Sequence, residues 1–130
     1  MIIIDYVQFQ TILKVKKCKK KKIALIFGIS GQDGAYLAHF LIKKNYKIVG
    51  ITRNKSLSNL FRLKKLKIFH KITILKGTAL NINFLNKIIT NNKNIKEIYY
   101  LAGDSSVIKS FDYPDISLKS NTFGILNILM

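Results

Sequence analysis

KIALIFGISGQDGAYLAHFLI, residues 22–42, joins five consecutive apolar residues to a glycine-rich turn and then to a helix-forming segment. The apolar run Ile23–Phe27 is typical of a strand that is buried on both faces of a parallel sheet. Glycines follow at Gly28, Gly31 and Gly34. In that order they permit a sharp exit from the strand, a close approach of the backbone to a ligand, and tight packing of the helix against the strand. The stretch therefore predicts a strand–turn–helix unit.

The glycine spacing has two interpretations. It fits an ordinary strand-to-helix turn, and it also fits a turn that binds the phosphates of a nucleotide. The context favours the nucleotide, because an apolar strand precedes the turn, an apolar helix follows it, and a second strand comes about twenty residues later. The amides of residues 31–34 would then point at a pyrophosphate, aided by the positive end of the helix dipole.

The rest of the chain repeats this unit. Further strands are predicted at 47–52, 72–75 and 97–101. Helices are predicted from Gly34 to Lys44, from Ser58, from Asn81 and after Pro114. Because strand and helix alternate and crossovers are right-handed, the order predicts an α/β fold with a parallel sheet of strand order 3-2-1-4 and flanking helices.

Apolar spacing assigns a buried face to each of two longer helices. The expected buried side chains are Leu37, Phe40 and Leu41 in the first, and Phe84, Leu85, Ile88 and Ile89 in the third. Asn45 is expected to end the first helix in a left-handed conformation. Ser58 and Asn81 are expected to cap the second and third helices with their side chains.

The strand order places a crevice between the carboxyl ends of strands one and four, and ligands of open α/β sheets bind in such a crevice. The glycine turn then faces residues 102–107, AGDSSV. The end of the second strand should reach the ribose of an adenosine. An acidic residue there would bind a free 2′-hydroxyl, whereas Arg53, with Lys55 and Ser56 nearby, suits a 2′-phosphate. We therefore expect NADP, with NAD as the alternative and a merely solvated Arg53 as the other interpretation.

The charge of the chain is misleading. Its 130 residues carry a formal net charge of +17, which would ordinarily indicate nucleic acid or an anionic membrane. Arginine occurs only at Arg53 and Arg62, and lysine is enriched together with isoleucine and asparagine, as A/T-rich codons would produce. We therefore expect no nucleic-acid partner. We expect no membrane partner either, since no stretch approaches the roughly 18 apolar residues of a membrane span, and binding of the lysine-rich amino-terminal segment to a membrane surface is the minor alternative.

Several other features exclude function classes. Cys18 is the single cysteine, which excludes a disulfide framework and fits a reducing cytoplasm. His39 and His70 have no second ligand at metal spacing, so no metal site is expected. Residues 1–21 form a lysine-rich extension in an order opposite to that of a secretory signal, and we expect it to be weakly ordered.

Several blocks of this sequence carry a resemblance to a known family. The turn matches the pattern G-x-[ST]-G-Q-D-G-[SA]-Y-L, and four further blocks follow in order and spacing. They are SNLFRL (58–63), ALN (79–81), EIYYLAGDSSVIKSF (97–111) and NTFGILNIL (121–129). Residues 22–130 thus resemble the amino-terminal part of GDP-mannose 4,6-dehydratases, which are extended short-chain dehydrogenase/reductase enzymes of the NAD-dependent epimerase/dehydratase superfamily.

The resemblance implies a partial Rossmann fold over residues 22–130, truncated before its second half. It implies the conversion of GDP-mannose to GDP-4-keto-6-deoxymannose by transient C4 oxidation with NADP, in an enzyme that is a homo-oligomer at full length. The implied cofactor-binding residues are Gly28, Ser30, Gly31, Gln32, Asp33, Gly34, Arg53, Thr78, Ala79, Leu101, Ala102, Gly103 and Ser105. Ser105 and Ser106 are implied on the substrate side, and Thr78 stands where many members have Asp.

No catalytic residue is expected within residues 1–130. The family's acid/base pair is Tyr-x-x-x-Lys, and Tyr99, Tyr100 and Tyr113 have no lysine four residues later. We therefore expect an amino-terminal fragment that binds the cofactor and is inactive alone. The alternatives are a non-catalytic nucleotide-binding remnant and another sugar-nucleotide epimerase or dehydratase.

Overall fold

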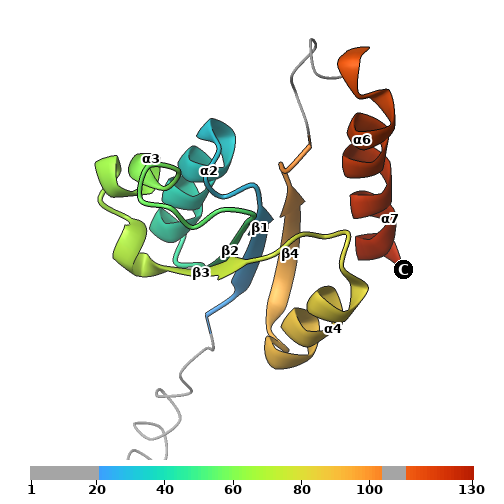
Figure 1. The fold of residues 1–130 in the computed structure, drawn as a ribbon. Helices are drawn as coiled ribbons and strands as arrows, with labels where there is room; N and C mark the ends of the chain where they lie inside the picture. The colour runs from blue at the N-terminus through green and yellow to red at the C-terminus, as the bar shows by residue number, and fades with distance from the viewer. Residues whose placement is uncertain (1–20, 104–110) are drawn as a thin grey trace, which may run out of the picture.

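The computed structural model describes residues 21–103 and 111–130. Four parallel strands form one sheet in the order β3-β2-β1-β4 (Figure 1). The strands are β1 (Ile23–Phe27), β2 (Lys47–Thr52), β3 (Ile72–Lys76) and β4 (Ile95–Tyr100). The predicted α/β class, parallel sheet and strand order are confirmed. The lysine-rich extension lies outside the described residues except for Lys21, so its order stays a prediction.

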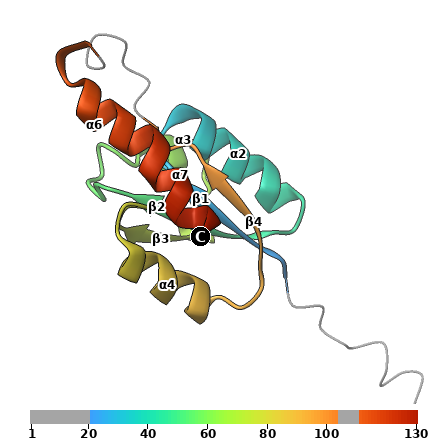
Figure 2. The same ribbon diagram turned by 90° about the vertical axis from the view of Figure 1, so that its right-hand side faces the viewer.

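Helices cover both faces of the sheet (Figures 1 and 2). On one face lie α2 (Gln32–Lys43) and α3 (Phe61–Lys65), followed by the 3₁₀ turn η1 (Phe69–Lys71). On the other face lie α4 (Ile82–Asn91) and a last helical stretch. That stretch consists of α6 (Pro114–Leu118), the π-helical turn η2 (Lys119–Phe123) and α7 (Gly124–Leu129).

Strand β1 is the centre of the fold, and all five of its residues are buried. Ala24 and Ile26 pack into the cluster below α2 and α3. Leu25 and Phe27 pack into the cluster below α4. Side chains alternate across a strand, so a continuous apolar run is needed where helices cover both faces. The glycine turn after β1 therefore starts from a strand that is buried along its whole length.

Two predicted buried positions are wrong. Phe40 of α2 is 54 % exposed and Ile89 of α4 is 44 % exposed. In α2 the small residues Ala35 and Ala38 take the contact with the sheet, together with Leu41. Small side chains let the helix approach the strands closely, which rotates the larger Phe40 toward solvent. A pattern of large apolar residues alone does not reveal this.

The helix ends agree with the sequence at two of three positions. Asn45 has a φ of 66°, which confirms the left-handed end after α2. The Asn81 side chain accepts from the Phe84 amide at 3.0 Å, which confirms the cap of α4. The Ser58 cap is wrong, because a turn precedes α3 and places Leu60 at the capping position. Helix α2 begins at Gln32 rather than at Gly34.

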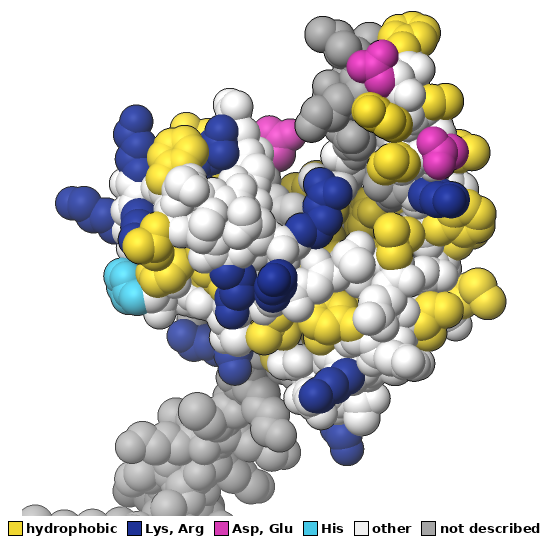
Figure 3. Space-filling view, viewed as in Figure 1, with side chains coloured by type: hydrophobic (Ala, Val, Ile, Leu, Met, Phe, Trp, Pro, Cys, Tyr) yellow, Lys and Arg dark blue, Asp and Glu magenta, His cyan; other side chains and the backbone are white. Residues whose placement is uncertain are grey.

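The last part of the chain packs less completely than the first. Strand β4 pairs with β1 alone among the described strands, and its burial alternates between intermediate and exposed. Apolar side chains gather on the surface over α6 and α7, whereas basic ones are scattered (Figure 3). The large exposed apolar residues from residue 111 onward are Phe111, Tyr113, Ile116, Leu118, Phe123, Ile125, Leu126, Leu129 and Met130. Within the described residues, no helix has the length and apolarity to cross a membrane.

Candidate cofactor-binding cleft

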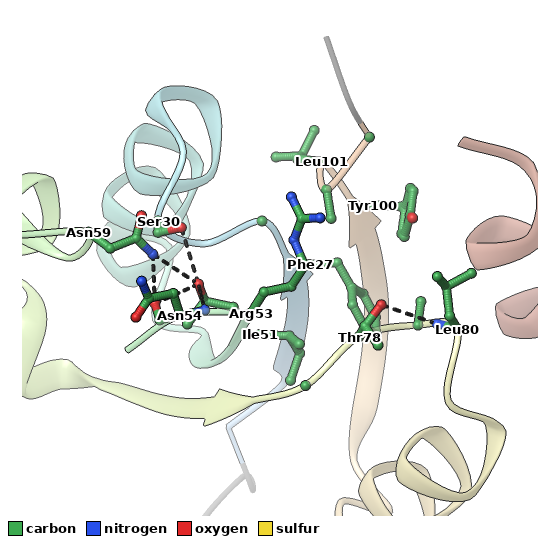
Figure 4. A pocket seen from close by; sticks show the side chains of 16 residues that line it. Phe27, Ser30, Ile51, Arg53, Asn54, Asn59, Thr78, Leu80, Tyr100 and Leu101 are labelled. Carbon is green, nitrogen blue, oxygen red and sulfur yellow. Dashed lines mark hydrogen bonds between the residues drawn. The ribbon is translucent and has the colours of Figure 1, made fainter. Parts of the chain in front are cut away.

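A cleft of about 400 Å³ opens at the carboxyl ends of β1, β2 and β4 (Figure 4). This is the place that the strand order predicts, since neighbouring strands there send their connections to opposite faces. The residues that line it are Phe27, Gly28, Ser30, Ile51, Thr52, Arg53, Asn54, Asn59, Gly77, Thr78, Ala79, Leu80, Tyr100, Leu101, Ala102 and Gly103.

Two glycines give the glycine turn its shape. Gly28 has a φ of +85°, and a Cβ added there would lie 2.5 Å from the carbonyl oxygen of Leu101. A hydrogen bond of 2.9 Å from the Leu101 amide to the Phe27 carbonyl joins the same two strand ends. At Gly34 an added Cβ would overlap with the Gly28 carbonyl oxygen, so α2 packs directly on the turn. These positions admit no side chain, and the backbone itself forms the floor of the cleft.

The amino terminus of α2 follows the turn directly. Gly31 occupies the N-cap position, and no side-chain hydrogen bond caps the helix there. The amides of Gln32, Asp33 and Gly34 belong to the first turn, where a helix supplies no carbonyl partner. Gly31, Gln32 and Asp33 are also exposed. These donors and the positive end of the helix dipole suit a phosphate, although the Asp33 carboxylate adds a negative charge in the same turn.

A buried hydroxyl ties the turn to the end of β2. Thr52 is 5 % exposed, and its Oγ1 lies 3.2 Å from Ser30 Oγ. The same hydroxyl donates to the Asn54 carbonyl at 3.0 Å and accepts from the Asn59 Nδ2 amide at 3.2 Å (Figure 4). Asn59 Nδ2 also donates to the Asn54 carbonyl at 2.6 Å. The two loops that form this wall of the cleft are therefore fixed by one network.

Arg53 extends through the middle of the cleft, toward the ends of β1 and β4 (Figure 4). Opposite it lies Tyr100, whose ring centroid is 5.8 Å from that of Phe27. Burial raises the pKa of the Tyr100 hydroxyl, and the positive charge of Arg53 acts against this rise. Arg53 is thus close enough to influence the far wall of the cleft, and its charge faces the interior of the site.

The third wall follows β3 and is fixed by α7. The Leu80 amide donates to Thr78 Oγ1 at 3.3 Å, which closes a short turn. Asn127 of α7 donates to the Ala79 carbonyl at 3.0 Å, although 48 residues separate the two. Ala79 is buried. Helix α7 therefore takes part in the cleft by holding one of its loops in place.

The structure brings most of the expected site residues together. Those that line the cleft are Gly28, Ser30, Arg53, Thr78, Ala79, Leu101, Ala102 and Gly103. Those that begin α2 beside it are Gly31, Gln32, Asp33 and Gly34. Ser105 and Ser106 lie outside the described residues, so their place on the substrate side stays a prediction.

A second group of residues lines the cleft without having been predicted from the sequence. They are Phe27, Ile51, Thr52, Asn54, Asn59, Gly77, Leu80 and Tyr100. Most of them end a predicted strand or follow one directly, and that position could have predicted them. Asn59 lies in the SNLFRL block, where only its place in the resemblance gave a signal.

Comparison with known proteins identifies the family. The family model described as GDP-mannose 4,6 dehydratase matches residues 25–130, most of the chain. The chain belongs to the GDP-mannose 4,6-dehydratase family. Similar members are GDP-mannose 4,6 dehydratase 2 of Caenorhabditis elegans (35 % identity) and the GDP-mannose 4,6 dehydratases of Drosophila melanogaster (41 %) and Homo sapiens (37 %). The matches cover 97, 85 and 85 % of this chain but only 35, 29 and 31 % of those proteins.

Solved structures agree on the fold of this dehydratase-family chain. The epimerase Mth375 of Methanothermobacter thermautotrophicus matches with a TM-score of 0.70 at 22 % identity, over 84 % of this chain and 31 % of that one. The UDP-glucose 4-epimerase of Thermotoga maritima matches with a TM-score of 0.70 at 19 % identity, over 82 % of this chain and 32 % of that one. The chain thus has a Rossmann-type fold and spans about a third of the length of its relatives.

Proposed function

We propose that the described residues hold a nicotinamide dinucleotide, as the cofactor-binding part of a sugar-nucleotide dehydratase that acts on GDP-mannose. The observation that carries the proposal is the glycine turn, where Gly28 and Gly34 admit no Cβ and the first amides of α2 follow directly. The names of the relatives, several of them GDP-mannose dehydratases, support the substrate.

The residues present fit a dinucleotide. Residues 28–33 would cradle the pyrophosphate with backbone amides, because bare backbone can approach phosphate oxygens without a side chain in the way. Thr78 and Ala79 would border the adenine, and residues 101–103 would line the nicotinamide side. When bound, the dinucleotide would supply an acceptor and donor of hydride. The chain's own contribution is to bind, orient and exclude water.

We propose NADP rather than NAD. Arg53 directly follows β2, and a guanidinium pairs with a phosphate through two parallel hydrogen bonds. None of the six acidic residues of the chain lies between β2 and α3, where a carboxylate would bind a free 2′-hydroxyl. The segment after β2 carries Arg53 and Lys55 instead.

We further propose that residues 1–130 bind without turnover. No tyrosine in this sequence has a lysine four residues later, so the proton-transfer pair is missing from these residues. Ser105 and Ser106 remain proposed for the approach of the sugar nucleotide. A cytoplasmic location and a homo-oligomeric state of a full-length enzyme also remain proposals.

The test is calorimetric titration of the chain with NADP, NAD and GDP-mannose. We expect NADP to bind more tightly than NAD. Arg53→Gln should weaken NADP binding about 10- to 100-fold, because it removes a charge-assisted pair, and should leave NAD binding within about twofold. Lys65→Gln is the matched control, since it removes an exposed charge from a residue that does not line the cleft. The proposal is refuted if neither NADP nor NAD binds to the folded chain.

A further inference from the structure

The two arginines of the chain have an uneven distribution. Lysine and arginine together number 23, yet arginine occurs only at Arg53 and Arg62, and both lie between β2 and the end of α3. Arg53 lines the cleft, whereas Arg62 lies on the outer side of the glycine turn. In a chain that uses lysine almost everywhere, an arginine suggests a position where the planar guanidinium is needed.

Arg62 makes two contacts that a lysine could not make together. Its Nη1 donates to the carbonyl oxygen of Ser30 at 3.3 Å, across 32 residues of sequence. Its Cζ lies 4.7 Å from the centroid of the Phe61 ring. The flat guanidinium stacks on a ring and donates from its edge at the same time, whereas an ammonium is a compact charge with no such plane. The half-buried Arg62 side chain is therefore held in one orientation.

The orientation of the Ser30 carbonyl sets the orientation of the next peptide amide in the turn. It shares a rigid peptide plane with the amide of Gly31, because the peptide bond is planar. That amide donates to the Gly28 carbonyl at 3.0 Å, and Gly31 is the N-cap of α2. A bond that fixes the Ser30 carbonyl therefore also fixes the turn from which the first amides of α2 emerge.

Segment 59–62 holds Ser30 from two directions. Arg62 binds its carbonyl, and Asn59 binds Thr52, whose hydroxyl lies 3.2 Å from Ser30 Oγ. The turn before α3 and the first residues of α3 thereby connect the end of β2 to the glycine turn. Arg62 itself is absent from the residues that line the cleft.

We propose that Arg62 is a positioning residue for the pyrophosphate of the dinucleotide. It acts through the Ser30–Gly31 peptide and makes no contact with the ligand. The inference rests on the proposed function and deepens it, since it names the part of the ligand that Arg62 serves. It predicts that Arg62 matters equally for NADP and NAD, because both share the pyrophosphate. Arg53, in contrast, should matter for the 2′-phosphate.

The experiment compares Arg62→Gln, Arg62→Lys and the control Lys65→Gln, which removes an exposed charge from the same helix. Dissociation constants are measured for NADP, NAD and adenosine 2′-monophosphate, a ligand without pyrophosphate. We expect Arg62→Gln to weaken both dinucleotides by the same factor, about three- to tenfold, since a charge-assisted hydrogen bond is lost. Adenosine 2′-monophosphate should change by less than about twofold, and Lys65→Gln should have no effect. Arg62→Lys should restore little of the loss despite keeping the charge.

Three outcomes would overturn the inference. If Arg62→Gln leaves the dissociation constants of NADP and NAD unchanged, the bond to Ser30 is dispensable. A loss confined to NADP would show direct contact with the 2′-phosphate. An equal loss for adenosine 2′-monophosphate would show a general loss of structure. Circular dichroism monitors the folding of each variant. If Arg62→Gln does not fold, the binding of the two dinucleotides by Arg62→Lys decides the question instead. A wild-type chain that binds no dinucleotide would refute the proposed function as well, whereas normal binding with an insensitive Arg62 refutes this inference alone.

Discussion

Two sides of the cleft differ in how they are supported. The first wall is formed by the ends of β1 and β2, and the second wall combines the end of β4 with the loop after β3 that α7 holds. The wall formed by the ends of β1 and β2 rests on strands that are almost completely buried between α2, α3 and α4. The opposite wall rests on β4, which has a strand neighbour on one side only among the described residues, and on α7, whose apolar residues are largely exposed (Figure 3).

The difference separates two sources of stability. Complete burial of a large apolar side chain stabilises a fold by about 1.5–3 kcal/mol, so the first wall carries most of the hydrophobic stabilisation. The second wall depends on a few specific contacts, such as the bond from Asn127 to the Ala79 carbonyl. Substitutions in the first wall should therefore be costly and substitutions in the second should be mild.

Gly28→Ala should have the largest effect. Its Cβ would lie 2.5 Å from the backbone oxygen of Leu101, and alanine at a φ of +85° is strained. We expect a loss of about 3–4 kcal/mol in the free energy of unfolding, measured by urea denaturation, together with loss of dinucleotide binding.

Gly103→Ala is the matched control in the second wall. A Cβ there would meet the side-chain oxygen of Asn121, which belongs to a side chain rather than to fixed backbone. We expect a loss below about 1.5 kcal/mol, because the overlap is with the end of a side chain and not with fixed backbone, and the backbone at Gly103 has no positive φ. Equal losses for the two glycines would remove the distinction between the walls.

Leu63→Ala should have the next largest effect. Leu63 of α3 is 0 % exposed and lies in the cluster between α3 and the sheet. Its truncation leaves a cavity, and we expect a loss of about 3 kcal/mol in the urea-derived free energy of unfolding. Leu129 of α7 is 77 % exposed, and Leu129→Ala should cost less than about 0.5 kcal/mol. A large cost at Leu129 would mean that α7 buries it in solution.

The sequence predicts the first wall better than the second. The five-residue apolar run and the glycine spacing indicate β1, its turn and α2, because burial on both faces and backbone contact each leave a clear pattern. Asn45 and Asn81 were predictable for the same reason, since their short amide side chains suit helix ends.

Contacts between distant segments leave no such pattern. The bond from Asn127 to Ala79 and the bond from Arg62 to Ser30 join residues 48 and 32 positions apart. The exposure of Phe40 depends on how closely two alanines let α2 approach the sheet. These features depend on the three-dimensional arrangement of the elements, and local spacing does not encode them.

A polar cluster fastens β4 to the residue that precedes β2. Tyr46 and Tyr99 each donate a hydroxyl hydrogen bond of 2.6 Å to Glu97. Hydrogen bonds from Tyr46 and then Tyr99, with the charge of Lys22, lower the pKa of the Glu97 carboxyl despite some desolvation. The same bonds to Glu97 raise the pKa of each tyrosine hydroxyl, with smaller contributions from burial and from the carboxylate charge.

Glu97→Gln should have the smallest effect, visible mainly as a change in pH dependence. A lowered carboxyl pKa stabilises the fold above the ordinary value of 4.5, and this contribution is lost as the pH falls through the lowered pKa. The raised tyrosine pKa values stabilise the fold at pH values below the ordinary pKa of 10.0. This contribution is lost as the pH rises through the raised pKa values. The difference in urea midpoint between wild type and Glu97→Gln should therefore be largest between these limits and shrink outside both.

Tyr99→Phe sharpens this last test, because it removes one of the two bonds and leaves the carboxylate in place. Its pH dependence should lie between those of wild type and Glu97→Gln. A difference that stays constant across the pH range would mean that Glu97 supports β4 by packing rather than by its charge. The second wall would then be held by apolar contact like the first, and the contrast between them would be one of degree.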